Sequence, residues 1–120
     1  YAAFEAGNIA LALPRIAAAN RIYTRVLEGD HPLLADNLIL QGRVQIASGA
    51  PEAALASLAQ AQAIYARLFG PGNAAVGDAE FYMAEAESRR GRLVPALAHI
   101  ARAKRIYDAE YGPDDPDQAE

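Results

Sequence analysis

The chain has 120 residues, of which 52% are hydrophobic, and its formal net charge is −4 at pH 7. This length is enough for one domain with a continuous apolar core, whereas the acidic balance argues against nucleic acid as the main ligand, because phosphate binding draws on a basic surface. Cysteine is missing, which excludes disulfides and thiolate chemistry, and no apolar run approaches the roughly 18 residues of a membrane span. We therefore expect a soluble protein that contacts neither nucleic acid nor membrane. The cysteine count leaves secreted and cytosolic locations both open, and the lack of a targeting segment favours a cytoplasmic one.

Residues of the same kind recur at intervals of 42 along the chain. The Ile-Tyr pair at 22–23 returns at 64–65 and at 106–107, and columns of Gly, Ala and Leu return in the same register. Self-similarity at this scale is typical of solenoids, whose units bury their apolar faces only against neighbouring units. Because a residue present in all three copies performs a task needed three times, we expect Tyr23, Tyr65 and Tyr107 to make core or inter-repeat contacts.

We expect two helices in each copy, in a chain rich in alanine, the best helix former. The first copy, 1–31, begins inside its first helix, and its second helix starts near Ile9. Pro14 lies about one turn into that second helix, where its missing N–H and its ring would either bend the helix or mark its true start.

The second copy, 32–73, is expected to hold one helix over 33–48 and another from Pro51 to about Phe69. Apolar residues occupy two adjoining faces of the earlier helix, so it should be sandwiched between neighbours. Pro51 suits the first helical position, where a missing N–H costs nothing. The turn before the copy offers two N-cap candidates, since His31 has the aligned position but Asp30 is the stronger cap.

The third copy, 74–115, is expected to hold helices over 74–90 and 93–111. Asn73 should cap the first of them, and Pro95, close to the start of the second, should be harmless. Asp115 and Pro116 repeat the cap and helix-start signals. We therefore expect residues 116–120 to begin a truncated fourth copy, and the chain to be part of a longer protein.

The pattern of Gly42, Gly49, Ala54 and Ala61 resembles the tetratricopeptide repeat, with a small residue in the first helix, Gly at the turn, and small residues where the two helices cross. The 42-residue period and the Gly-Pro-Asp-Asp-Pro turn at 112–116 are similar to the longer, kinesin-light-chain variety, which is common in bacterial proteins. The resemblance covers essentially the whole chain. It implies an all-α, right-handed α-α superhelix of antiparallel hairpins that serves as a protein-binding scaffold, without indicating a specific partner.

Polar residues replace part of the apolar pattern that this family usually shows. We expect these replacements to weaken the usual packing, and the aromatic pair at 81–82 to supply the missing apolar volume. Four positions carry such a replacement: Gln41, Gln45, Glu80 and Glu87.

In solenoids of this family the first helix of each pair lines the concave surface. Apolar groups in that groove would give affinity for an extended or helical peptide, and charges would fix its register. Two alternatives stay open: neighbouring helices bury Ile39, Ile46 and Phe81, or Glu85 and Arg89 form only an i,i+4 surface pair. The family's groove positions fall on ten residues: Phe4, Asp36, Ile39, Arg43, Ile46, Asp78, Phe81, Glu85, Ser88 and Arg89.

Signatures of catalysis and metal binding are missing from the sequence. No serine has a histidine at motif spacing, and there is no phosphate-binding Gly loop and no HExxH. His31 and His99 lie in different copies and cannot assemble a zinc set. We therefore expect no enzyme, cofactor or metal, but a non-catalytic scaffold that binds a protein or peptide in its groove. The alternative is a structural spacer or self-association module of a larger regulatory or signalling protein, forming homo-oligomers through repeat ends around 1–6 and 97–107.

Overall fold

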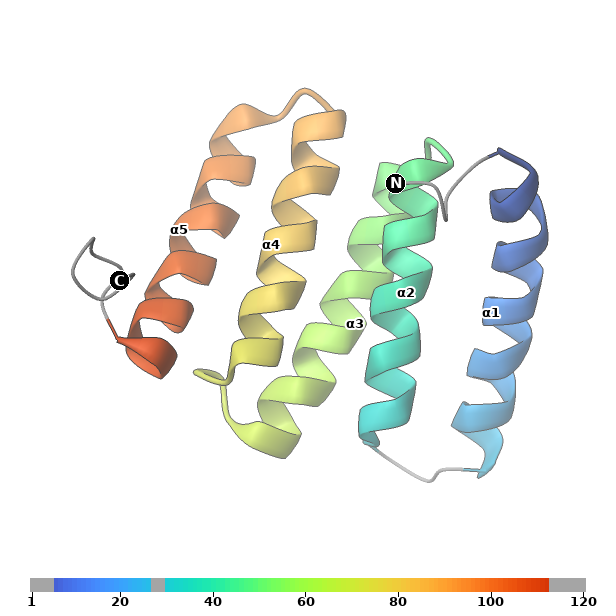
Figure 1. Cartoon of the computed structure of the whole chain (residues 1–120), viewed down its shortest axis with the longest axis horizontal. Coiled ribbons are helices and arrows are strands. Elements are labelled where there is room, and N and C mark those ends of the chain that lie inside the picture. Colours follow the sequence, from blue (N-terminus) through green and yellow to red (C-terminus); the bar gives the residue numbers. More distant parts are fainter. Residues whose placement is uncertain (1–5, 27–29, 113–120) are drawn as a thin grey trace.

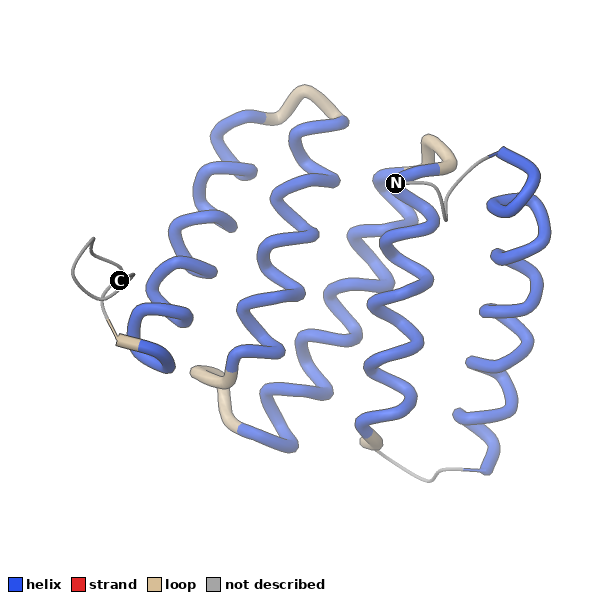
Figure 2. Tube along the Cα trace, in the orientation of Figure 1, coloured by secondary structure: helices blue, strands red, loops and turns tan. Residues whose placement is uncertain are grey.

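The computed structural model describes residues 6–26 and 30–112, which form five α-helices and no strand. The helices follow one another in a row from α1 at one end to α5 at the other, with successive helices antiparallel (Figures 1 and 2). The predicted all-α helical-repeat fold is confirmed, and none of the described helices is long and apolar enough to cross a bilayer. The helices are α1 (Ala6–Val26), α2 (Pro32–Ala47), α3 (Pro51–Phe69), α4 (Ala74–Arg89) and α5 (Leu93–Tyr111).

Side chains of the preceding turns cap the first helix of each hairpin. Asn73 accepts a hydrogen bond from the Ala75 N–H at 2.9 Å, as predicted. At α2 the cap is His31, whose Nδ1 accepts from the Leu33 N–H at 3.1 Å. Asp30 was the stronger candidate by residue type, but its carboxylate accepts from Arg67 of α3 instead. Asp115 lies outside the described residues.

Prolines and glycines mark most of the helix boundaries. Helix α1 runs through Pro14, so it does not begin at that proline, whereas Pro51 stands in the first turn of α3, as expected. Helices α2 and α4 are followed by Gly49 and Gly91, which are 42 residues apart and have φ of 87° and 76°. This left-handed region favours glycine, so the two equivalent turns require it.

Small residues allow the two helices of a hairpin to approach closely. Ala54 and Ala61 of α3 are fully buried, and a Cβ built on Gly42 of α2 would lie 2.6 Å from Leu58 Cγ. Helix α2 packs against α1, α3 and α4. The prediction that this helix is sandwiched is therefore confirmed.

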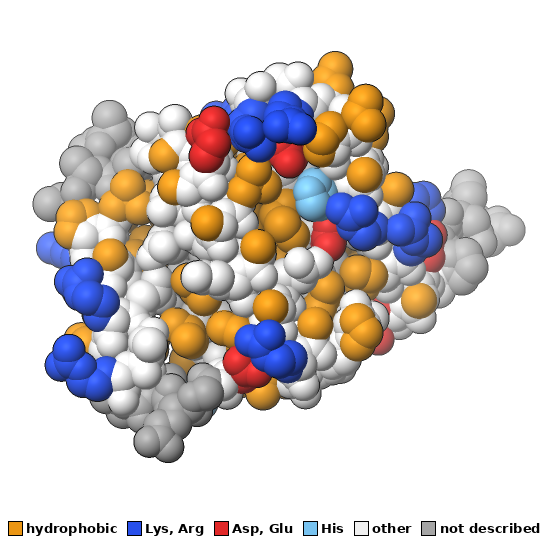
Figure 3. Space-filling view, turned by 180° about the vertical axis from the view of Figure 1, so that it is seen from behind, with side chains coloured by type: hydrophobic (Ala, Val, Ile, Leu, Met, Phe, Trp, Pro, Cys, Tyr) orange, Lys and Arg blue, Asp and Glu red, His pale blue; other side chains and the backbone are white. Residues whose placement is uncertain are grey.

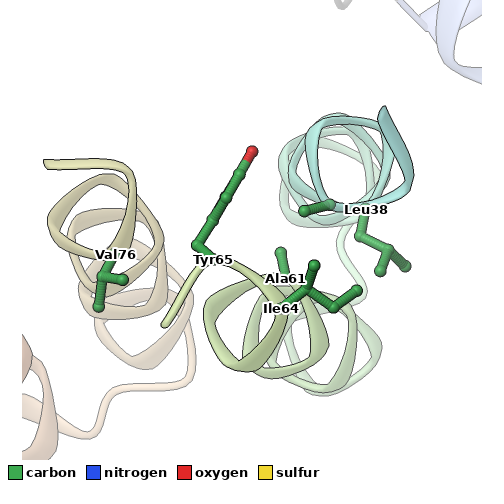
Figure 4. Packing of buried hydrophobic residues seen from close by; sticks show 6 residues of the cluster. Leu38, Ala61, Ile64, Tyr65 and Val76 are labelled. Carbon is green, nitrogen blue, oxygen red and sulfur yellow. The ribbon is translucent and has the colours of Figure 1, made fainter. Parts of the chain in front are cut away.

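The recurring tyrosines pack between neighbouring helices. Figure 4 shows the Tyr65 ring extending from α3 into the space between α2 and α4, and Tyr65 belongs to the same buried cluster as Leu38 of α2 and Val76 of α4. Tyr65 is buried, and Tyr107 is half-buried with its ring edge 3.0 Å from the position of a Cβ on Gly77. The predicted packing role is confirmed for these two residues.

Candidate protein-binding surface

An aromatic and cationic patch spans the first helices of the second and third copies. The Arg43 guanidinium of α2 lies over the ring of Tyr82 in α4, with its Cζ 5.1 Å from the ring centroid. A cation at this distance is attracted by the negative face of the ring. The Tyr82 ring in turn meets Phe81 edge-on, with centroids 5.7 Å apart. Tyr82 was not among the candidate groove residues, because the register places its neighbour Phe81 there.

Phe81 is the largest exposed group of this patch, with 52% of its surface accessible. It therefore remains available to a partner and does not fill the apolar volume that the polar replacements leave. That expectation was wrong for Phe81, because about half of its surface is exposed to solvent rather than packed in the core. Next along α4, Glu85 and Arg89 form an ion pair at 3.5 Å, and both side chains are about half exposed. Ser88 beside them is also exposed.

The isoleucines of α2 belong wholly or partly to the core. Ile46 is 2% exposed and packs with Leu58 of α3 and Met83 of α4, so its side chain is closed to a partner. Ile39 is half-buried and touches both apolar clusters of the molecule. The burial alternative thus applies to Ile46 and partly to Ile39. Phe4 lies outside the described residues.

Two of the candidate groove residues, Asp36 and Asp78, accept hydrogen bonds from the recurring tyrosines. The Tyr65 hydroxyl donates to Asp36, and the Tyr107 hydroxyl donates to Asp78 with an O–O distance of 2.5 Å. Burial, followed by the hydrogen bond to the carboxylate, raises the pKa of both tyrosines above the usual value. Both aspartates are exposed. Their carboxylates are therefore oriented by the fold yet accessible from solvent.

Glu80 of α4 is buried in a polar cluster that joins three helices. Only 3% of the residue is exposed, and its Oε1 lies 2.6 Å from His99 Nδ1 and 3.1 Å from Arg102 Nε, both on α5. A carboxylate only accepts hydrogen bonds, so His99 donates to it when Nδ1 carries the proton, and Arg102 Nη2 lies 2.9 Å from the same ring nitrogen. Gln62 of α3 donates to the other oxygen. The view from behind shows a histidine beside acidic and basic side chains (Figure 3).

A second polar chain links α1, α2 and α3. Gln41 donates to the Ser57 hydroxyl at 2.9 Å, and that hydroxyl donates to Gln45 at 2.8 Å. Asn20 of α1 donates to the oxygen of Gln41. No buried polar side-chain atom among the described residues lacks a partner. The polar replacements at these positions are thus hydrogen-bonded rather than defects of packing, which the family pattern alone did not predict.

An apolar cleft of about 450 Å³ opens between α4 and α5. The α4 wall carries three of the candidate groove residues, Phe81, Glu85 and Ser88. The α5 wall was not predicted, because second helices lie outside the concave groove in the family pattern. It contributes the exposed side chains Leu93, Leu97 and Ile100.

Comparison with known proteins agrees with the repeated helical hairpins of the structure. A family model described as Tetratricopeptide repeat matches residues 1–67, more than half of the chain. No curated protein matches the chain. Repeats of this family are generally non-catalytic and mediate protein–protein interaction. The hairpin of α4 and α5 lies beyond the matched segment and repeats the same packing 42 residues further on. The chain belongs to the tetratricopeptide repeat family.

Proposed function

We propose that the chain is a non-catalytic scaffold that binds a protein or peptide partner on the side formed by α2 and α4. The observation that carries the proposal is the exposed Phe81 beside the Arg43–Tyr82 contact. Aromatic residues and arginine are the side chains most often responsible for binding energy at protein interfaces. These three residues differ from their counterparts in the other copy, so repeat packing does not explain them.

Charged side chains around the patch determine which charged and hydrogen-bonding groups a partner should have. Arg43 and Arg89 favour acidic groups on the ligand. Asp36 and Asp78, oriented by their tyrosines, can accept hydrogen bonds from the partner's main-chain N–H groups or basic side chains. The surface comprises Asp36, Ile39, Arg43, Asp78, Phe81, Glu85, Ser88 and Arg89, without the buried Ile46.

The test is selection of peptides from a displayed random library against the whole chain, followed by affinity measurement on variants. We expect the selected peptides to lose at least about tenfold in affinity when Arg43→Glu is combined with Phe81→Ala. The matched control is Arg21→Glu, which makes the same charge change on exposed α1 and should leave affinity unchanged. Equal binding to wild type and to the double variant would overturn the proposal.

A structural or self-association role is the second candidate. The exposed aliphatic side chains of α5, led by Val94 at 79% accessible, favour it. Sedimentation equilibrium over a concentration series separates the two functions. A monomer supports the scaffold, whereas association that Val94→Asp abolishes supports the self-association module.

We further infer that the repeat units span 32–73 and 74–115, in the manner of the longer, kinesin-light-chain variety. The support is that α2 and α4 begin 42 residues apart, at Pro32 and Ala74. A cytoplasmic regulatory or signalling protein, which binds neither nucleic acid nor membrane, fits the acidic composition.

A further inference from the structure

We propose that the groove between α3 and α5 binds a short extended segment of a second partner protein, which places one acidic and one apolar side chain in it. This α3–α5 groove has a volume of about 490 Å³ and is lined by α3, α4, α5 and the turn before α4. None of its lining residues belongs to the proposed surface on α2 and α4. The inference therefore goes beyond the scaffold function, because it gives the chain a separate site for a different ligand.

The equivalent groove one copy earlier shows that a following repeat leaves this surface open. This counterpart groove, between α1 and α3, has a volume of about 520 Å³. Most of its lining residues stand 42 positions before those of the α3–α5 groove, as Asn20 does before Gln62. Helices α4 and α5 follow the counterpart groove in the chain and do not cover it. A repeat that follows α5 would stand in the same relation to the α3–α5 groove and would leave it open too.

The α3–α5 groove differs from its counterpart in the charges at one end. Glu80, Arg102 and Arg105 stand where the preceding copy has Leu, Gln and Ala. Two arginines and one glutamate give the lining a net positive charge, and the view from behind shows basic side chains next to the histidine (Figure 3). Because these three residues do not recur, repeat packing does not require them. We therefore assign the charge preference of the site to this polar end.

Glu80 holds Arg102 in place at the polar end. Its buried carboxylate accepts from Arg102 Nε at 3.1 Å, and Arg102 Nη2 lies 2.9 Å from His99 Nδ1. The Arg102 side chain nevertheless stays 44% exposed, and Arg105 on the same helix is exposed as well. A guanidinium that is already oriented loses less conformational freedom when it binds a carboxylate. Glu80, whose burial costs free energy, thus acts as a positioning residue for Arg102.

The other end of the α3–α5 groove is apolar and accessible. In the counterpart groove, Asp30 and Arg67 form an ion pair at this end, with an N–O distance of 2.8 Å. The third copy has Gly72 and Ala109 at the same two positions. Without the ion pair, an apolar side chain of the partner can pack against these small residues and Val76.

The dimensions of the groove determine the spacing of the two partner side chains. The midpoint between Arg102 and Arg105 lies about 8 Å from Ala109 along the axis of α5, at about 1.5 Å per residue. Residues i and i+2 of an extended chain are about 7 Å apart and point to the same side. An extended chain meets this spacing more closely than a helix, whose residues i and i+4 are about 6 Å apart along the axis. The partner segment should therefore carry Asp or Glu two residues away from Leu, Ile or Phe.

Two blocked hexapeptides provide the probe, one containing Leu-Ser-Glu and the other Glu-Ser-Leu, with serine at all other positions. The two orders cover both chain directions. We expect at least one of them to bind the labelled whole chain saturably, with amide chemical-shift changes concentrated on α3, α5 and the turn at 70–73. The same peptide with Gln in place of Glu should bind at least about fivefold more weakly, because the arginines lose a charged acceptor.

A variant that copies the counterpart groove tests the apolar end. Gly72→Asp combined with Ala109→Arg introduces the ion pair of the preceding copy without changing the net charge. No atom lies within 4 Å of a Cβ on Gly72, and Ala109 is exposed, so the variant should fold, which circular dichroism checks. Because the new pair occupies the site of the apolar side chain, peptide affinity should fall at least about tenfold.

A second variant tests the polar end. Glu80→Leu with His99→Ser and Arg102→Gln replaces this end by the residues of the preceding copy, again without a change in net charge. Peptide affinity should fall at least about tenfold even where stability is retained, which a purely structural role of the cluster would not produce. The matched control is Lys104→Ala, which removes a positive charge from α5 outside the groove and should leave affinity within about twofold.

The inference fails if neither peptide shifts the groove amides, if the Glu and Gln peptides bind equally, or if either folded variant binds as tightly as wild type. Binding of the chain to phosphatidylserine vesicles in place of the peptides would also overturn it, because the ligand would then be an anionic membrane. Failure here leaves the scaffold function separately testable, since peptides selected on the α2–α4 side depend on Arg43, which does not line the α3–α5 groove.

Discussion

The Tyr65 hydroxyl of α3 donates a hydrogen bond to Asp36 of α2, and the Tyr107 hydroxyl of α5 donates the equivalent bond to Asp78 of α4. In each hairpin the second helix therefore holds a carboxylate of the first helix. This contact couples the repeat core to the candidate binding surface, because the same aspartates face the proposed partner. The stacked rings of Tyr65 with Phe69 and of Tyr107 with Tyr111 repeat the arrangement at the same centroid distance of 6.3 Å.

Tyr65→Phe should lower the free energy of unfolding by about 1 kcal/mol, because it removes one hydrogen bond to an exposed carboxylate without changing apolar packing. Urea unfolding followed by circular dichroism measures the change. Tyr111→Phe is the control, since Tyr111 is largely exposed, and it should have no effect. Equal stability of Tyr65→Phe and wild type would show that the bond adds nothing.

Stability should also fall at alkaline pH because of these two tyrosines. The folded state raises the pKa of both hydroxyls above the unfolded value of about 10. A raised pKa in the folded state means that folding favours the neutral hydroxyl. The stability that the two hydroxyls contribute is therefore complete below the unfolded pKa of about 10 and is lost as the pH rises above it. The double variant Tyr65→Phe with Tyr107→Phe should therefore lose less stability than wild type between pH 9 and pH 11, about the range where tyrosine titrates. Parallel urea midpoints across that range would contradict this assignment.

Gly42→Ala should destabilise the protein by about 1 to 3 kcal/mol, because the new methyl group would press on the fully buried Leu58. The loss should exceed the roughly 1 kcal/mol that Ala gains over Gly in helix propensity. Gly72→Ala is the matched control, with no atom within 4 Å of its Cβ position. A stabilised Gly42→Ala protein would mean that α2 and α3 are more loosely packed than the structure indicates.

The sequence predicted much of the fold because repeat packing is encoded in recurring residues. Ala54, Ala61 and Tyr65 recur and are buried, and the turn glycines recur with the same backbone conformation. The hydrogen bond from Tyr to Asp was also predictable in principle, since Asp36 and Asp78 recur at the same interval as the tyrosines. The family resemblance instead assigned both aspartates to partner binding. The Glu80 cluster was not predictable, because its members come from three helices and do not recur.

Replacing Glu80 by its counterpart in the preceding copy should show how that cluster works. Glu80→Leu, copied from Leu38, should cost about 2 kcal/mol, because Gln62, His99 and Arg102 lose their acceptor. Adding His99→Ser and Arg102→Gln, the residues at 57 and 60 in the preceding copy, should recover most of the loss. Thermal unfolding of the single and triple variants measures both effects. A single variant as stable as wild type would mean that the cluster contributes no net stability.

The candidate binding surface on α2 and α4 was only partly predictable from the sequence. Register placed Arg43, Phe81 and Glu85 on the first helices, and all three have solvent access. Register alone could not show that α4 would cover Ile46 while its counterpart Ser88 stays open. The difference in burial depends on whether another helix packs against the position. The arrangement of the hairpins determines this, and the identity of either residue does not.

The most direct test of the scaffold function is an amide chemical-shift map of the labelled chain with a peptide selected against it. We predict that the perturbed residues will centre on α2 and α4, around Asp36, Arg43, Asp78 and Arg89, and that Arg43→Glu will remove the perturbations. Perturbations confined to α1 and α3, or a pattern that Arg43→Glu leaves intact, would contradict the proposal that this side of the solenoid receives the partner.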